Sequence, residues 1–331
     1  MKWTAWLTVG ALALIVPTLN STTGRADDGN PAYTSADEAP VDFRFQGEYL
    51  GSPVEDPNFK IGVQVIALGE GKFDLVAYHG GLPGAGWSRG DETIKATGEL
   101  DGDKAVFTSD EGRAEIKNGE MKVWDNDGNH IATLNKVKRE SPTLGERPAD
   151  GAVVLFDGSS ADEFENGRLV EEKYLGATNV TSKLKLTDHH LHIEFRTPFM
   201  PKSRGQGRGN SGVYVQGRFE VQVLDSFGLD GKNNECGGIY SVGEPAVNMC
   251  LPPLSWQTYD IDFTAARYDD AGNKTANARI TVRHNGVLIH DNVELPNGTP
   301  GGKPDGVGPE GLFLQDHGNP VVFRNIWVVE K

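Results

Sequence analysis

The chain has 331 residues, of which 37% are hydrophobic, so its length favours about two domains with packed cores. Its net charge of −15 argues against nucleic acid as a partner, because phosphate binding needs clustered Lys and Arg. With 42 Gly, 18 Pro and few long apolar runs, the sequence is typical of a turn-rich, all-β protein.

The first residues have the pattern of a targeting segment. Lys2 precedes an apolar run at 5–16 that is too short to span a bilayer, and Gly24-Arg25-Ala26 supplies small residues for cleavage. We therefore expect a signal peptide at 1–26 and an exported protein, periplasmic or extracellular, with no membrane attachment after cleavage. Residues 27–40 are polar and small, which predicts a disordered segment.

Residues 41–138 are predicted to form a small β domain. Ile61, Val63 and Val65 alternate with other residues in the first of several short strands. Turn signals then recur, as in Asn118-Gly119 and Asp127-Gly128. Strands at this spacing favour a sandwich or a small barrel. We find no catalytic constellation here, so this domain is expected to shape or cover a site on the second domain or to mediate assembly. The oligomeric state stays open.

Residues 139–150 are predicted to be a linker, because Pro142, Gly145 and Pro148 disfavour both helix and strand. Almost every element expected in 151–331 is a strand with alternating apolar residues. Asn285-Gly286 marks one hairpin. Such strands bury their apolar faces between two sheets, which predicts a sandwich or jelly roll.

The most informative stretch is 209–225, which is predicted to be a tight turn followed by one long strand. Its apolar residues alternate with a polar set that cannot join the core. The polar set consists of Tyr214, Gln216, Arg218, Glu220 and Gln222. This face could bind a sugar, or it could be the solvated face of an ordinary antiparallel sheet.

The two cysteines, Cys236 and Cys250, are predicted to form a disulfide. The bond would close a loop of 15 residues, counted from one cysteine to the other. Such a loop is worth about 3 kcal/mol on the chain-entropy model. The pairing fits an oxidising compartment. A metal pair is disfavoured, because no His or further Cys lies at zinc spacing nearby.

Several motifs in 151–331 resemble one known family. They are LFDG at 155–158, NSGV at 210–213, FEVQVLD at 219–225, LQDH at 314–317 and FRNI at 323–326. In this order they are similar to the 3-keto-disaccharide hydrolase family. The resemblance implies a concanavalin-like jelly roll in an exported carbohydrate-active protein that cleaves glycosides carrying a ketone at C3. Gln216 stands where many members have Arg, which places a charge-dependent role there in doubt.

The implied chemistry differs from that of ordinary glycosidases. A C3 ketone acidifies the C2 hydrogen, so a base can remove it, the C1 substituent leaves by elimination, and water adds back. With the resemblance in hand, the catalytic candidates are Glu220, His317 and Asp225. The substrate-binding candidates are Asn210, Gln216, Arg218, Gln222, Gln315 and Trp256. A divalent metal could hold the keto oxygen, but no ligand spacing demands one, so the metal ligands stay unknown.

Each candidate also has a structural explanation. Glu220 could pair with Arg218 or Arg324, and Asp225 could cap a turn. His189, His190 and His192 look like a metal cluster, but alternation places the first two on opposite faces. Two other functions therefore stay open. One is a non-catalytic carbohydrate-binding module. The other is an ordinary glycosidase with Glu220 and Asp225 as its carboxylate pair.

Overall fold

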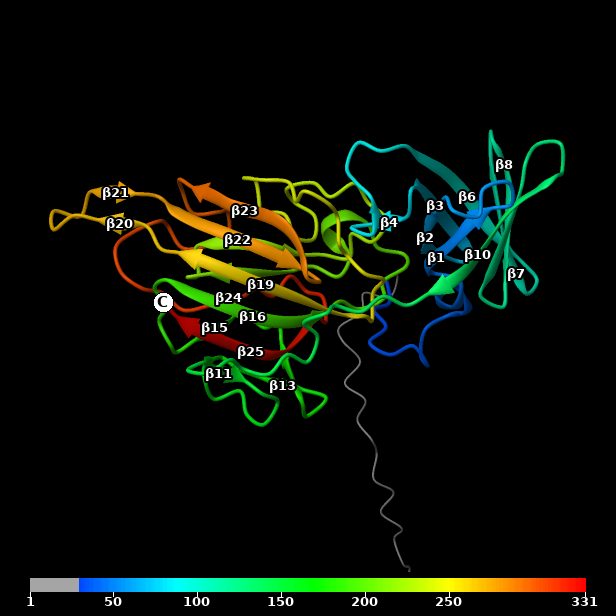
Figure 1. Ribbon diagram of the computed structural model, residues 1–331. Coiled ribbons are helices and arrows are strands. Elements are labelled where there is room, and N and C mark those ends of the chain that lie inside the picture. The colour runs from blue at the N-terminus through cyan, green and yellow to red at the C-terminus, as the bar shows by residue number, and fades with distance from the viewer. Residues whose placement is uncertain (1–29) are drawn as a thin grey trace, which may run out of the picture.

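The computed structural model describes residues 30–331 and contains two bodies built almost entirely of strands (Figure 1). The all-β prediction is confirmed. The predicted signal peptide and residues 27–29 lie outside the described residues. Residues 30–40 differ from the expected disorder, because the backbone of Tyr33 exchanges two hydrogen bonds of 2.9 Å with that of Phe199. Within residues 30–331 no helix is long and apolar enough to cross a membrane.

The first body is a closed antiparallel barrel, which decides between the two architectures expected for this region. Its interior is filled by side chains such as Tyr49, Phe73, Phe107 and Leu134. The short helix η1 (Val41–Arg44) precedes it, and a small parallel pair, β4 (Leu82–Pro83) and β5 (Gly86–Trp87), lies beside it. In their order around the barrel, the strands are β1 (Gly47–Pro53), β10 (His130–Val137), β9 (Glu120–Trp124), β8 (Gly112–Lys117), β7 (Lys104–Ser109), β6 (Thr93–Asp101), β3 (Lys72–His79) and β2 (Ile61–Gly69).

The second body is a jelly-roll sandwich of two sheets, as predicted. The larger sheet has the order β13 (Leu169–Val170), β14 (Tyr174–Gly176), β25 (Val322–Glu330), β16 (His189–Arg196), β19 (Trp256–Thr264), β22 (Ala278–His284) and β23 (Val287–Leu295), with β11 (Val153–Phe156) also paired to β25. The smaller sheet has the order β12 (Phe164–Glu165), β15 (Val180–Ser182), β24 (Phe313–Leu314), β17 (Ser211–Val215) and β18 (Phe219–Val223). A single core fills the space between them.

Two peripheral elements complete the second body. A hairpin of β20 (Arg267–Tyr268) and β21 (Lys274–Ala276) projects from one end (Figure 1). The short helix η2 (Gly205–Gly207) precedes β17. The predicted Asn285-Gly286 turn is confirmed between β22 and β23. Asn285 and Gly286 both have positive φ, 50° and 78°, as a tight hairpin turn requires.

The predicted long strand at 209–225 is instead the hairpin of β17 and β18. Gln216 and Gly217 both have positive φ, 51° and 59°, so the chain reverses between Val215 and Phe219, which pair across the turn. The predicted faces survive this correction, because Val213 and Val221 lie opposite each other on the core side. The turn was missed because Gln, unlike Asn or Asp, seldom adopts positive φ.

The predicted disulfide is absent. Cys236 and Cys250 are free, buried thiols in the sandwich core. Cys236 Sγ lies 3.3 Å from the Tyr259 hydroxyl, and Cys250 Sγ lies 3.4 Å from the Leu224 carbonyl oxygen. Hydrogen bonds from the Asn248 amide to the carbonyl oxygens of Ser226 and Leu229 already tie down the loop that the disulfide would have closed.

Close contacts join the two bodies. Gly228 of the sandwich has φ 77°, and a Cβ there would lie 2.4 Å from Ile66 Cδ1 of the barrel, so a larger residue would be strained and would push Ile66 aside. The linker residue Arg139 donates to both carboxylate oxygens of Glu48 and to the Pro83 carbonyl oxygen. The linker therefore has a defined place against the barrel, although it is neither helix nor strand.

Candidate functional site

The candidate site lies on the face of the smaller sheet that points away from the core. Strand register places Tyr214 of β17 directly opposite Glu220 of β18, and Gly212 opposite Gln222. Gln315 follows β24 and bonds through its backbone N–H to the Gly212 carbonyl oxygen. Three neighbouring chain segments thus bring phenol, carboxylate and amide groups onto one face. We call Gln206, Asn210, Tyr214, Glu220, Gln222 and Gln315 the Glu220 cluster.

The centre of the cluster is a short hydrogen-bonded chain. The Tyr214 hydroxyl donates to Glu220 Oε2 at 2.8 Å, and the Gln315 amide donates to the Tyr214 hydroxyl at 3.2 Å. Glu220 is only 2% exposed. Burial raises the pKa of Glu220 to about 7, and the Tyr214 hydrogen bond opposes the rise. Burial, together with the charge of Glu220, raises the pKa of Tyr214, which therefore stays protonated.

Gly212 allows the carboxylate to lie this close to β17. A Cβ at this position would stand 2.3 Å from Glu220 Oε1 and 2.7 Å from the Tyr214 ring. Gln222, with its amide nitrogen turned toward the nearby acceptors, donates to Glu220 Oε1 at 2.8 Å and to the Ser211 carbonyl oxygen at 2.9 Å. Like the bond from Tyr214, this contact favours the ionised carboxylate. The Gly in NSGV is therefore a packing requirement of the site.

Asn210 and Gln206 form one edge of the cluster. Asn210 Nδ2 donates to the Gln206 carbonyl oxygen at 2.8 Å, while the buried Asn210 Oδ1 has no hydrogen-bond partner within residues 30–331. An unmatched buried acceptor is a place where a ligand hydroxyl can donate. Gln206 and Gln315 are the partly exposed members of the cluster, whereas Asn210, Tyr214, Glu220 and Gln222 are buried.

His317 lies outside this hydrogen-bonded cluster. It is exposed in the loop after β24, two residues beyond Gln315. The same loop touches the cluster's edge, because Asn319 Oδ1 accepts from the Asn210 N–H at 2.7 Å. The structure therefore places His317 in a segment that borders the site, without a contact to Glu220.

Gln216 and Arg218 lie at the hairpin turn, where they hold other segments in place. Gln216 Nε2 donates to the Leu186 carbonyl oxygen at 2.6 Å. Arg218 donates to the carbonyl oxygens of Pro304 and Gly308 and to Gln216 Oε1. Both side chains are buried by these contacts. They therefore hold neighbouring loops in place and do not belong to the Glu220 cluster.

Asp225 and Trp256 are not brought into the cluster. Asp225 accepts a hydrogen bond of 2.6 Å from Arg208 Nε in a buried ion pair that faces the barrel. Glu220 and Asp225 therefore do not form the carboxylate pair of an ordinary glycosidase. Trp256 lies on the other sheet, where Arg324 Cζ stands 4.0 Å from its ring centroid and Tyr174 packs beside it.

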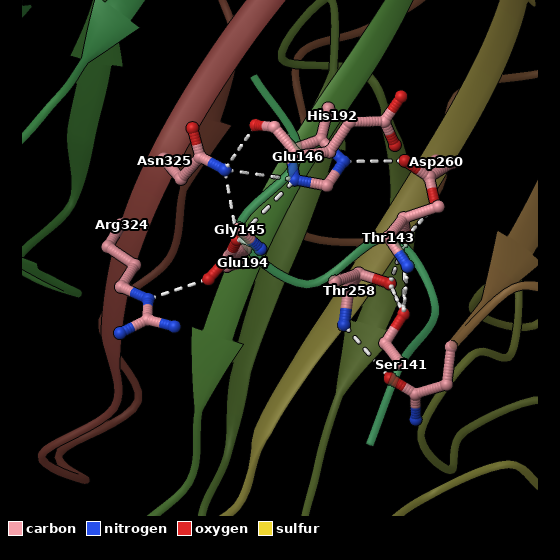
Figure 2. A network of polar contacts seen from close by, with 11 residues as sticks. Ser141, Thr143, Gly145, Glu146, His192, Glu194, Thr258, Asp260, Arg324 and Asn325 are labelled. Carbon is pink, nitrogen blue, oxygen red and sulfur yellow. Dashed lines mark hydrogen bonds and ion pairs between the residues drawn. The ribbon is translucent and has the colours of Figure 1, made fainter. Parts of the chain in front are cut away.

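A second polar group, which the sequence did not predict, lies on the outer face of the larger sheet (Figure 2). His192 Nδ1 donates to Asp260 Oδ1 at 2.6 Å, and Glu194 accepts from Arg324 Nε at 2.6 Å. The Asn325 amide donates to Glu194 Oε1 at 2.9 Å. We call these five residues the His192 network. The alternation along β16 indicated that His192 and Glu194 share one face. It did not indicate that Asp260, on the neighbouring strand β19, lies opposite His192.

The linker covers the His192 network. The Gly145 N–H donates to Glu194 Oε1 at 2.6 Å, and the Thr143 hydroxyl donates to Asp260 Oδ2 at 2.8 Å (Figure 2). Ser141 Oγ lies 2.6 Å from Thr258 Oγ1. These contacts explain why His192 and Glu194 are fully buried although they point away from the sandwich core.

His192 is charged in this setting. Burial lowers its pKa, but the hydrogen bonds with Asp260 and Glu194 outweigh burial and raise the pKa to about 9. For Glu194, burial raises the pKa, while His192, Asn325, Gly145 and Arg324 together lower it to about 2. The Asn325 amide gives its hydrogens to Glu194 Oε1 and the Glu146 carbonyl oxygen, which leaves His192 Nε2–H facing Glu194 at 3.7 Å.

One group with the residue types of a metal site occurs within residues 30–331. Ligand atoms of Glu146, His192 and Asp260 lie within 4.8 Å of one another. His192 and Asp260 are already joined directly by a hydrogen bond, which occupies His192 Nδ1. In this structure these two residues therefore form a buried ion pair that the linker covers. His189 is buried on the core side and His190 is on the outer face, as the alternation predicted.

Comparisons with known proteins cover the second body. A family model described as a 3-keto-alpha-glucoside-1,2-lyase-like domain matches residues 151–329. Among solved structures, a "putative glycosyl hydrolase" from Parabacteroides distasonis ATCC 8503 is 30% identical, with a TM-score of 0.50 over 55% of this chain and 84% of that chain. A second structure with the same description and organism is 17% identical, with a TM-score of 0.40 over 55% of this chain and 94% of that chain. No curated protein matches.

Proposed function

The chain belongs to the 3-keto-alpha-glucoside-1,2-lyase-like family, and on that premise we propose that it cleaves glycosides whose C3 hydroxyl has been oxidised to a ketone. The observation that carries the proposal is Glu220, a buried carboxyl whose pKa of about 7 suits a general base at neutral pH. Around it stand a phenol and amides that can hydrogen-bond sugar oxygens. The 30%-identical solved structure supports action on a carbohydrate.

The reaction proceeds in two stages. Glu220 takes the proton from C2, and the electron pair moves toward the C3 oxygen to give an enolate. Gln315 is the proposed donor to this oxygen, because its amide uses one N–H for the Tyr214 hydroxyl and keeps a second. The enolate then reforms the ketone and expels the C1 substituent, whose oxygen takes up a proton. Water adds to the resulting double bond, so the net change is hydrolysis.

His317 is the proposed acid for the leaving group. It is an exposed side chain in the loop that borders the cluster at Asn210 and Asn319. Asp225, Gln216, Arg218 and Trp256 have no part in this mechanism, because their side chains are held elsewhere.

Incubation with an α-glucoside and with its 3-keto derivative tests the function directly. The expected result is release of the C1 substituent from the keto form only. Release from the parent glucoside at a similar rate would indicate an ordinary glycosidase, and binding without release from either would indicate a carbohydrate-binding module. A parallel run with a chelator determines whether a divalent metal takes part.

Replacing Tyr214 by Phe should move the ascending limb of the pH profile of kcat/KM to higher pH. The hydroxyl stabilises the ionised form of Glu220, so its removal raises the pKa of the base further. The measurement is kcat/KM for the 3-keto glucoside between pH 5 and about 9. Tyr174→Phe, on the other sheet, is the matched control and should leave the limb in place. An unmoved limb in Tyr214→Phe would show that Glu220 is not the titrating base.

Replacing His317 by Ala should lower kcat more than it changes KM, and the loss should be smaller for substrates with a good leaving group. An acid matters most when the departing oxygen is basic. Comparing an alkyl with a nitrophenyl 3-keto glucoside measures the difference. His130→Ala, at an exposed histidine of the barrel, is the control. Equal losses for both leaving groups would remove His317 from the acid role.

We also propose that the protein is exported, on the strength of the leader-like sequence at 1–26. Mass spectrometry of the protein from its native host should find a mature N-terminus after Ala26. An intact Met1 in the mature protein would contradict cleavage.

A further inference from the structure

A cleft of about 500 Å³ separates the barrel from the sandwich, and no step of the proposed reaction uses it. Its volume lies within the range of small-molecule sites. Its walls come from β2, β3, β6 and β7 of the barrel on one side, and from residues 204–208 and 225–229 of the sandwich on the other. The cleft therefore exists only because both bodies are present and fixed against each other.

The barrel wall carries a row of polar side chains across three strands. Asp74 of β3 pairs in register with Thr97 of β6, which pairs with Thr108 of β7. All three line the cleft and are exposed. Cross-strand neighbours on one face lie about 5 Å apart. A carboxylate and two hydroxyls at this spacing match the hydroxyls of a sugar ring, which both donate and accept hydrogen bonds.

The sandwich wall contributes two arginines and an apolar patch. Arg204 Nη2 donates to the Leu68 carbonyl oxygen at 3.0 Å, and Arg208 Nη1 donates to the Ala67 carbonyl oxygen at 3.3 Å. Both residues thus cross to β2 of the barrel and hold the wall in place. Leu229, which is exposed, adds apolar surface of the kind on which the C–H face of a sugar packs.

Arg208 also leaves a hydrogen-bond donor unused. It is 4% exposed, its Nε is committed to Asp225, and its buried Nη2 has no partner within residues 30–331. Such a group requires an acceptor, because an unmatched buried donor costs stability. The ionisable residues that line the cleft are balanced: Lys95, Arg204 and Arg208 against Asp74, Asp110 and Asp225. The balance favours a neutral ligand rich in oxygen over an anion or a cation.

We propose that the cleft between the barrel and the sandwich binds a neutral sugar unit, through the Asp74, Thr97 and Thr108 row on one wall and Arg208 on the other. The segment 204–210 contributes side chains both to the cleft and to the Glu220 cluster. Gln206 and Asn210 belong to the Glu220 cluster, while Arg204 and Arg208 line the cleft. The cleft is thus an additional sugar subsite for longer glycosides, and the choice of ligand rests on the proposed function.

The test is equilibrium binding of maltotriose to the full chain by titration calorimetry, with inorganic sulfate as the anionic alternative. Thr97→Trp places a large ring in the cleft from an exposed position on β6. Thr93→Trp, on the same strand and face but outside the cleft, is the matched control. Asp74→Ala removes a carboxylate without adding bulk. Glu220→Gln alters the catalytic cluster alone, so binding is measured apart from turnover.

Maltotriose should bind to the unmodified protein, to Thr93→Trp and to Glu220→Gln with similar affinity. Thr97→Trp should abolish this binding, and Asp74→Ala should weaken it at least about tenfold, as expected for a hydrogen bond to a charged group. Sulfate should not compete. Loss of binding in Glu220→Gln with retention in Thr97→Trp would place the sugar in the Glu220 cluster and overturn the proposal, as would absence of binding or competition by sulfate. None of these outcomes depends on whether the 3-keto glucoside is cleaved.

Discussion

Replacing Glu220 by Gln is expected to reduce kcat/KM for the 3-keto glucoside by about 10²–10⁴-fold, the usual contribution of a general base. Gln has nearly the same shape and can still contact the Tyr214 hydroxyl, but it cannot accept the C2 proton. The buried carboxyl itself costs stability when it ionises. Because its pKa is higher in the folded than in the unfolded chain, the free energy of unfolding should fall as pH rises from about 4.5 to about 7.

The control for this variant is Glu165→Gln, an exposed glutamate on β12 of the same sheet. It should leave both kcat/KM and the pH dependence of unfolding unchanged. Glu220→Gln should unfold at a urea concentration at least as high as the unmodified protein does at pH 8, because the substitution removes a buried charge. Full activity in a folded Glu220→Gln variant would refute the proposed base.

The His192 network should have the largest effect on stability. Replacing His192 by Gln leaves the carboxylates of Asp260 and Glu194 buried without the imidazolium between them. Removal of one partner from a buried ion pair costs about 3–5 kcal/mol. The shift of the His192 pKa from 6.5 to about 9 corresponds to about 3 kcal/mol, which agrees with that range. Urea unfolding at pH 6 measures the loss.

The raised pKa of His192 also predicts how the free energy of unfolding changes with pH. A histidine whose pKa is raised on folding stabilises the fold fully below about pH 6.5, and this contribution disappears as pH rises through about 9. The unmodified protein should therefore lose stability across that window, and His192→Gln should show a flatter profile there. Glu194 acts in the opposite direction, because its lowered pKa contributes stability that is lost as pH falls toward 2. The other acidic groups near the ring are Asp260 and Glu146, and Arg324 pairs with Glu194 on the far side of that carboxylate.

His190→Gln is the matched control, since His190 lies on the same strand and face but is half-buried beside Asp262. Its replacement should cost less than about 1 kcal/mol, because its contact with Asp262 lies at the partly exposed surface. Equal stability losses in the two variants, or an unchanged pH profile in His192→Gln, would contradict a charged His192 held by the linker.

The linker illustrates why composition predicted only part of the structure. Pro142, Gly145 and Pro148 correctly excluded helix and strand over 139–150. What composition could not show is that Thr143 and Gly145 bind two carboxylates of a distant sheet. Those hydrogen bonds depend on positions more than 40 residues away, which no local pattern contains.

The faces of the smaller sheet were predictable, because alternation of apolar and polar residues directly reflects which side of a strand is buried. That pattern determined that Tyr214, Glu220 and Gln222 share the face opposite the core, and the motifs around them determined the family. The hairpin turn at Gln216 and Gly217 reverses the chain without disturbing the alternation, so the pattern was the same for one strand or two.

By itself, then, the sequence determined the all-β class, the jelly roll and the polar face that contains Glu220, since all three follow from short-range periodicity and motif order. Only the tertiary structure decided that Asp225 pairs with Arg208, that Trp256 lies on the other sheet, that both thiols are free, and that a cleft lies between the two bodies. Each of these depends on which distant side chain lies within hydrogen-bonding or packing distance. That distance is a property of the folded chain, because strands far apart in sequence become neighbours only when the sheets and the barrel assemble.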